Sequence, residues 1–146
     1  MQAIGIDYGE RRIGLSYGDE IGVATPLKPA IEKSEAERIA HIARVAKERN
    51  ATDLVIGYPY NMDGSAGFKA KEVDVFIEKV GAVIDLPTHR IDERLTSVEA
   101  SKGFRSGRDD DLRRSGKLDS AAATLILQDF LNQRLPLMDY ESEDID

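Results

Sequence analysis

The chain has 146 residues, 41% of them hydrophobic and 32% charged, with no cysteine and a net charge of −7, which is typical of one globular domain. No apolar run approaches the roughly 20 residues of a membrane span, and no signal peptide is visible, so we expect a cytoplasmic protein without a membrane partner. The lack of cysteine excludes disulfides and thiolate metal sites, which leaves oxygen and histidine as the possible metal ligands.

The negative charge is unevenly distributed. The last eight residues, DYESEDID, hold five acids and no base, and the rest of the chain is close to neutral. Between residues 102 and 117, six basic residues stand against three acids. The overall acidity therefore does not exclude nucleic acid, whose binding proteins carry a basic patch. We expect one domain over residues 1–135 and an acidic, disordered tail over 136–146.

Three short strands are predicted at the N-terminus. Their expected ranges are 2–8, 12–17 and 21–27. The turns between them are so short that consecutive strands must be antiparallel neighbours in a meander. A helix follows in SEAERIAHIARVAKERN, where Ser34 and Glu37 form a capping box ahead of apolar residues at helical spacing.

Strands and helices then alternate. Buried strands are predicted over 53–59 and 87–92, with a helix between them marked by apolar residues from Val73 to Ile84. A second capping box, Thr96 and Glu99, predicts a short helix to about Gly103. Residues 105–116 predict a mobile loop, and a last helix is expected over 118–133. Its inward residues are expected to be Leu118, Ala122, Leu125, Ile126 and Phe130.

This order of elements predicts an α/β fold. An antiparallel three-strand meander is extended by two parallel strands, which gives a mixed five-stranded sheet with helices on both faces. Ligands of such sheets bind at the carboxyl ends of the strands. Asp7, Tyr58 and Glu93 fall at such ends, and Asp119 begins the last helix.

Three carboxylates therefore stand out by position: Asp7, Glu93 and Asp119. Singly, each has a simple structural explanation, because Asp7 can form an Asx turn, Glu93 can pair with Arg94, and Asp119 can cap its helix. Gathered at one end of a sheet they would repel one another and lose hydration, which a divalent cation with oxygen ligands offsets. Two such ions can assist phosphodiester cleavage without any nucleophilic side chain. His41 and His89, inside a helix and a strand, are expected to be structural.

Several other residues are candidates for nucleic-acid binding. Arg11, Arg12 and Arg94 are expected near the carboxylates, and the loop GYPYNMDGS, which contains Asn61, precedes a helix N-terminus that can bind phosphate. The alternatives are ordinary surface charges and a turn with a helix cap. Tyr58 and Tyr60 can either stack on bases or pack in the core. The basic segment offers further phosphate contacts, at Arg105, Arg108, Arg113, Arg114 and Lys117.

Four segments carry a family resemblance: GIDYGERRIGLS, VIGYPYNMDGS, DERLTSVEA and KLDSAAATLIL. In order and spacing they resemble the signature segments of the YqgF family, the Holliday junction resolvase-like proteins or pre-16S rRNA nucleases. The match covers residues 3 to about 134. The resemblance implies an RNase H-like fold, catalytic and metal-binding carboxylates at Asp7, Glu93 and Asp119, Mg²⁺ or Mn²⁺ as cofactor, and 5′-end processing of the small-subunit rRNA precursor.

We therefore expect a metal-dependent endonuclease acting on structured RNA during ribosome assembly, either as a monomer or as a weak homodimer. A Holliday-junction resolvase acting on branched DNA and a non-catalytic module that binds RNA or an assembly partner remain alternatives. A phosphotransferase of the actin or sugar-kinase type also begins with an Asp–x–Gly strand end. It needs a duplicated domain, however, for which 146 residues are too few.

Overall fold

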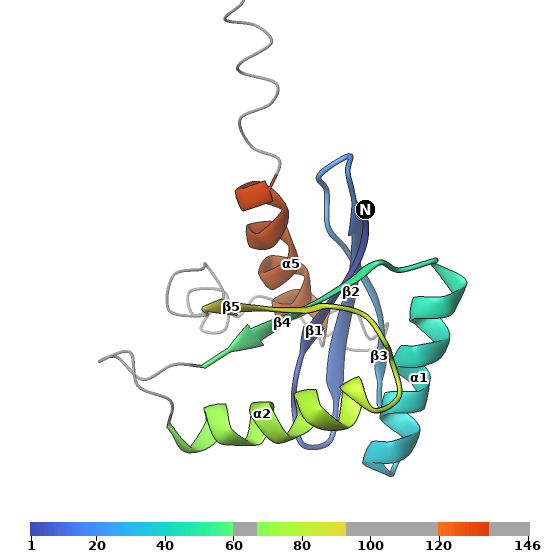
Figure 1. Ribbon diagram of the computed structural model, residues 1–146, viewed down its shortest axis with the longest axis vertical. Coiled ribbons are helices and arrows are strands. Elements are labelled where there is room, and N and C mark those ends of the chain that lie inside the picture. The colour runs from blue at the N-terminus through green and yellow to red at the C-terminus, as the bar shows by residue number, and fades with distance from the viewer. Residues whose placement is uncertain (60–66, 93–119, 135–146) are drawn as a thin grey trace, which may run out of the picture.

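The computed structural model describes residues 1–59, 67–92 and 120–134 (Figure 1). Its five strands are β1 (Gln2–Asp7), β2 (Ile13–Asp19), β3 (Thr25–Ala30), β4 (Asp53–Tyr58) and β5 (Thr88–Asp92), in the sheet order β3-β2-β1-β4-β5. The pairs β1–β2 and β2–β3 are antiparallel, whereas β1–β4 and β4–β5 are parallel. The predicted mixed five-stranded sheet is thus confirmed.

Helices cover both faces of this sheet (Figure 1). They are α1 (Glu35–Glu48), α2 (Phe68–Gly81) and α5 (Ala121–Arg134). The predicted capping box begins α1, since the hydroxyl of Ser34 accepts a hydrogen bond from the Glu37 N–H at 3.1 Å and donates one to its carboxylate at 2.9 Å. No helix in the described parts of the chain is long and apolar enough to cross a bilayer.

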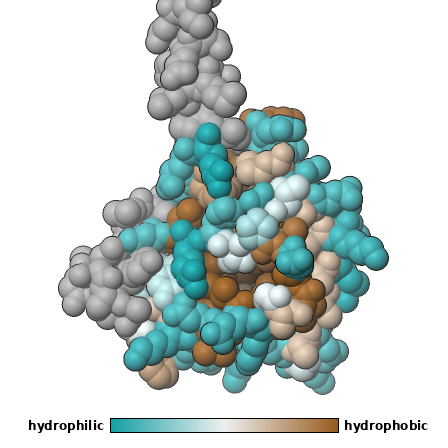
Figure 2. Space-filling view, viewed as in Figure 1, coloured by the Kyte–Doolittle hydropathy of each residue, from teal (hydrophilic) through white to brown (hydrophobic). Residues whose placement is uncertain are grey.

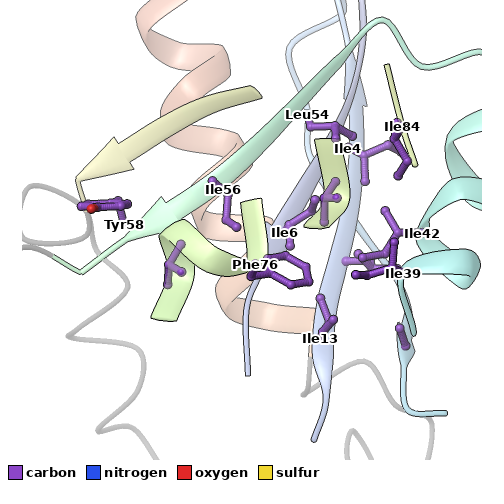
Figure 3. Close-up of a cluster of buried hydrophobic side chains, with 14 of the residues drawn as sticks. Ile4, Ile6, Ile13, Ile39, Ile42, Leu54, Ile56, Tyr58, Phe76 and Ile84 are labelled. Atoms are coloured by element: carbon purple, nitrogen blue, oxygen red, sulfur yellow. The ribbon is translucent and has the colours of Figure 1, made fainter. Parts of the chain in front are cut away.

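The sheet separates two apolar clusters. The larger one joins the sheet to α1 and α2 through residues such as Ile6, Ile42 and Phe76 (Figure 3). The smaller one joins the opposite face to α5 through residues such as Val55 and Leu127. Figure 2 shows the α1 and α2 side as a hydrophilic surface around a central apolar hollow. Each strand of the sheet centre is therefore buried from both sides, which fixes where its ends lie.

The third strand differs from its prediction, because it covers Thr25–Ala30 rather than 21–27. After β2 the chain turns through Gly22, whose φ of 92° favours glycine and whose N–H donates to the Asp19 carbonyl at 2.9 Å. Gln128 of α5 then holds this turn, since its side chain donates to the Gly22 carbonyl at 2.8 Å and accepts from the Ala24 N–H at 2.9 Å. The turn is longer than predicted, and the strand begins after it.

The last helix also differs in its inward face. Its buried residues are Ala123, Ile126, Leu127, Phe130 and Leu131, whereas the predicted Ala122 and Leu125 are only partly buried. The small residue Ala123 faces the sheet because β1 and α5 approach each other closely at this point. The predicted Leu118, the helix up to Gly103, the loop 105–116 and the tail 136–146 lie outside the described residues. The division of the chain at 135 stays a prediction.

Candidate active site

The strands β1, β4 and β5 run in the same direction and end at one edge of the sheet, here called the carboxyl edge. It is defined by their last residues, Asp7, Tyr58 and Asp92. Ile6 pairs with Ile56, and Tyr58 pairs with Asp92, so the three ends are in register across neighbouring strands. The predicted convergence of these strand ends is therefore confirmed.

Asp7 lies on the face of the sheet that α5 covers. Along β1, Ala3 belongs to the cluster with α5 and Gly5 lies against that helix, whereas Ile4 and Ile6 belong to the opposite cluster. Because side chains alternate along a strand, Asp7 follows Ala3 and Gly5 on the α5 face. Its side chain is partly buried. The carboxylate thus lies at the carboxyl edge, on the side where the last helix packs.

The start of α5 is attached to the same region by a fully buried serine. Ser120 donates a hydrogen bond to the Leu27 carbonyl at 2.6 Å and accepts one from the Leu15 N–H at 3.2 Å. Leu15 directly follows Gly14, the residue that pairs with Asp7 across β1 and β2. The residue that begins the last helical segment is therefore held one strand away from Asp7.

A close approach between β1 and α5 fixes the position of the helix. At Gly5, an added Cβ would overlap the Ser16 hydroxyl and lie 2.8 Å from both the Ala123 carbonyl oxygen and the Leu127 Cβ. The Ser16 hydroxyl itself donates to the Ala123 carbonyl at 2.7 Å, inside the protein. Because the β1 backbone at Gly5, the Ser16 hydroxyl and the α5 backbone at Ala123 leave no space between them, α5 can pack on the sheet in only one position.

Two of the predicted phosphate-binding residues lie in the turn that follows Asp7. Arg11 and Arg12 are exposed in the turn between β1 and β2. The turn is tight, since a Cβ at Gly9 would lie 2.5 Å from the Arg12 carbonyl oxygen. Asp7 and these two arginines are the predicted site residues that the described structure brings together.

The remaining predicted site residues lie outside the described residues. They are Glu93, Asp119, Asn61, Arg94, Arg105, Arg108, Arg113, Arg114 and Lys117. Their roles therefore stay predictions. Within residues 1–59, 67–92 and 120–134, no three acids or histidines come together in a way that could hold a metal ion. A three-carboxylate site that includes Asp7 would therefore draw on acids outside these ranges, and the choice of Glu93 and Asp119 stays a prediction.

Both histidines pair with acids that were not predicted as site residues. His41 of α1 lies 2.8 Å from Glu32, and His89 of β5 lies 2.8 Å from Asp53 at the start of β4. Burial raises the pKa of Asp53, but the hydrogen bonds from Thr52 and His89 outweigh it and hold that pKa below its ordinary value. These contacts are consistent with the prediction that both histidines are structural.

A polar cluster that sequence reasoning missed supports the ends of β4 and β5. Tyr58 is 5% exposed and donates to the Asp74 carboxylate of α2 at 2.8 Å. Arg90 donates to the same carboxylate at 3.3 Å, and its guanidinium lies 5.4 Å from the centre of the Tyr58 ring. Tyr58 therefore packs inside the protein, which was one of the two expectations for it. No local signal marked Asp74, because its partners come from two other elements.

Comparison with known proteins agrees with this geometry. The family model "RuvX: Holliday junction resolvase" matches residues 1–133. A protein of Opitutus terrae named "Putative pre-16S rRNA nuclease" is 50% identical over 137 residues, which cover 93% of this chain and 94% of that protein. One of Crocosphaera subtropica with the same name is 41% identical over 92% of this chain and 94% of its own length. This chain belongs to the RuvX family. The YqgF resemblance is thereby confirmed, since the two names denote one family.

The fold of this RuvX family member is also that of solved resolvases. Thermus thermophilus RuvC, solved in complex with a Holliday junction substrate, superposes with a TM-score of 0.53 at 15% identity and covers 92% of this chain and 96% of its own. The fowlpox virus resolvase, solved with Holliday junction DNA, gives a TM-score of 0.51 at 14% identity over 92% and 99%. At such low identity the likeness establishes the RNase H-like fold, which confirms that prediction.

Proposed function

We propose that this protein is a metal-dependent endonuclease that hydrolyses phosphodiester bonds in structured nucleic acid, with Asp7, Glu93 and Asp119 as its catalytic carboxylates. The observation that supports this most is the position of Asp7, at the carboxyl edge and on the α5 face of the sheet. Ligands of α/β sheets bind at that edge. The two other carboxylates are chain neighbours of residues that lie in the same region.

Glu93 directly follows Asp92, the last residue of β5. Along β5, Ile91 belongs to the cluster with α5, and His89 contacts Phe130 of that helix. By the same alternation Asp92 takes the opposite face, away from α5. This favours Glu93 over Asp92 as the partner of Asp7.

Asp119 directly precedes Ser120, whose hydroxyl holds the Leu15 N–H. As the chain neighbour of Ser120, Asp119 is the proposed ligand from the end of the chain. Three carboxylates from the start, middle and end of the chain are thus expected at one point of the sheet.

The donor set fits Mg²⁺ or Mn²⁺. All three proposed ligands are carboxylates, which hard divalent cations prefer, and both histidines are paired with acids elsewhere. When bound, such ions stabilise the charge on the attacking and leaving oxygens of a phosphodiester. Asp7, Glu93 and Asp119 would hold them, and the exposed Arg11 and Arg12 would bind and orient the neighbouring phosphates.

The substrate favoured here is the 5′ end of precursor 16S rRNA, processed in the cytoplasm during ribosome assembly. Support for it comes from the relatives of 41% and 50% identity, whose names specify a pre-16S rRNA nuclease. Branched DNA is the second candidate, since the family description names a Holliday junction resolvase. The Asn61, Arg94 and 105–117 contacts, and the choice between monomer and weak homodimer, belong to this proposal.

The test is cleavage of a precursor 16S rRNA fragment, and of a synthetic four-way DNA junction, with Mg²⁺ or Mn²⁺ present. Wild type and Asp7→Asn are compared with Asp85→Asn, a control that changes an exposed acid of the opposite edge. We expect Asp7→Asn to lose at least about 100-fold in rate, because each metal-stabilised charge is worth several kcal/mol, while the control keeps wild-type activity. Equal cleavage by wild type and Asp7→Asn would refute the assigned site. Binding of the RNA without cleavage, unaffected by Asp7→Asn, would indicate the non-catalytic module instead.

A further inference from the structure

A buried arginine connects α1 to the turn that carries Arg11 and Arg12. Arg38 lies in the first half of α1 and is 6% exposed. Its Nη2 donates to the Glu10 carbonyl at 2.9 Å, and its Nη1 donates to the Glu32 carbonyl at 2.6 Å. One guanidinium thus binds two backbone segments, the β1–β2 turn and the segment before α1.

Burial of the Arg38 guanidinium costs desolvation free energy. Arg38 shares the buried side of α1 with Ile39 and Ile42, where an apolar side chain would bury its surface without desolvating a charge. The hydrogen bonds from its two Nη atoms to carbonyl oxygens offset part of that desolvation cost. An arginine suits this position because its planar fork donates to two acceptors at once, whereas a lysine presents a single charged nitrogen.

The position of the turn gives this contact its significance. Glu10 lies three residues after Asp7 and next to Arg11. Gly9 already constrains the turn from within, through its close approach to the Arg12 carbonyl. The hydrogen bond from Arg38 constrains it from outside, at the residue between Gly9 and the two exposed arginines.

We propose that Arg38 is a positioning residue, which holds the β1–β2 turn so that Arg11 and Arg12 are oriented toward the phosphates of the nucleic acid. This inference rests on the proposed function, since it concerns the same site. Arg38 itself is buried, so its guanidinium is not presented at the surface. Its effect on binding must therefore pass through the turn.

The first experiment measures the turn without any nucleic acid. Backbone amide order parameters of residues 9–12 are compared by NMR in wild type, Arg38→Met and Arg44→Met. Arg44 is the matched control, because it lies on the same helix and near Glu32 but is 63% exposed. In Arg38→Met we expect the order parameters to fall from about 0.85 to below about 0.6, with no change in Arg44→Met. An unchanged turn in a folded Arg38→Met protein would overturn the proposal, whatever the substrate is.

The second experiment measures the consequence for binding. The probe is a fluorescein-labelled precursor 16S rRNA fragment, titrated in EDTA so that no cleavage occurs, at several salt concentrations. We expect Arg38→Met to weaken binding about tenfold, as when one charge-assisted contact is lost, and to lower the slope of log K against log salt by about 1. A buried side chain releases no counterions, so a changed slope must arise at the exposed arginines.

A double-mutant cycle completes the test. Arg38→Met is combined with Arg12→Ala and with the double variant Arg11→Ala/Arg12→Ala. If Arg38 acts through the turn, it weakens binding no further once both arginines are gone. Additive losses, or an unchanged salt slope, would show a general structural role and overturn the proposal. The two proposals can fail separately. If the turn becomes mobile in Arg38→Met but the wild-type protein does not bind the RNA at all, the proposed function is refuted, and with it the role of Arg38 in binding.

Discussion

The packing of α5 on β1 makes Gly5→Ala the most informative stability variant. The added methyl group would overlap the Ser16 hydroxyl and come within 2.8 Å of a carbonyl oxygen and of the Leu127 Cβ. The Ala123 carbonyl oxygen and the Leu127 Cβ are fixed to the α5 backbone, so the helix must shift and the Ser16 hydroxyl must rotate away. Overpacking of this kind costs about 1–3 kcal/mol. Displacement of the Ser16 hydroxyl from the Ala123 carbonyl adds about 1 kcal/mol.

The expected loss is therefore about 3 kcal/mol in the free energy of unfolding, or about 10 °C in Tm for a chain of this length. It is measured by urea unfolding followed by circular dichroism, with the m-value unchanged. Gly18→Ala should cost less, because its nearest obstacle is the tip of Leu131, at 2.6 Å. Gly81→Ala is the matched control, since nothing lies within 4 Å of its added Cβ, and alanine there should be neutral or stabilising. A Gly5→Ala protein within about 0.5 kcal/mol of wild type would refute the claim that α5 has one position.

Two further predictions concern buried polar contacts. Ser120→Ala removes the hydroxyl that binds Leu27 and Leu15, and should lower the free energy of unfolding by about 1–3 kcal/mol, as measured by urea unfolding; a neutral effect would show that these bonds contribute nothing. The pKa of Asp53 is lower in the folded protein than its ordinary value of 3.8, so the ionised carboxylate stabilises the fold at pH values above 3.8. This stabilisation is lost as the pH falls through the pKa of the folded state. Asp53→Asn should therefore flatten the acid limb of stability against pH, and an equally steep limb in the variant would contradict the role of its pairing with His89.

The parts of the fold that were predictable from sequence carry local signals. The apolar runs that give β1, β4 and β5 are short, and the strands predicted over 2–8, 53–59 and 87–92 end within one residue of the observed ends, which places the carboxyl edge correctly. The serine cap of α1 is equally local. Asp7 was identified because an acid at the end of a buried strand is conspicuous without any knowledge of its neighbours.

The prediction of the third strand over residues 21–27 was wrong for a physical reason. Ile21 and Val23 have the residue types of a strand, yet they are 82% and 60% exposed in the turn. The true strand contains Pro26, Lys28 and Pro29, which are uncommon inside sheets. The sheet tolerates these residues because β3 is an edge strand, where a missing N–H and a charged side chain need no partner.

The contacts that support the site could not be predicted at all. Arg38 resembles any other arginine of a charged helix, and its buried position depends on carbonyls from Glu10 and Glu32. The link between Tyr58, Asp74 and Arg90 likewise joins two strands and a helix. Such contacts follow from the tertiary fold and leave no periodicity in the sequence.

The hydrogen bonds between β2 and α5 also have a consequence for synthesis of the protein. Leu15 and Ser16 bind residues 105 and 107 positions later in the chain. At about 5–20 residues per second, a ribosome needs about 5–20 s to make the segment between them. During that time the first hairpin has no helix to cover one of its faces. All five strands are therefore synthesised before α5, and the face of the sheet on which Asp7 lies stays uncovered until that helix has been made.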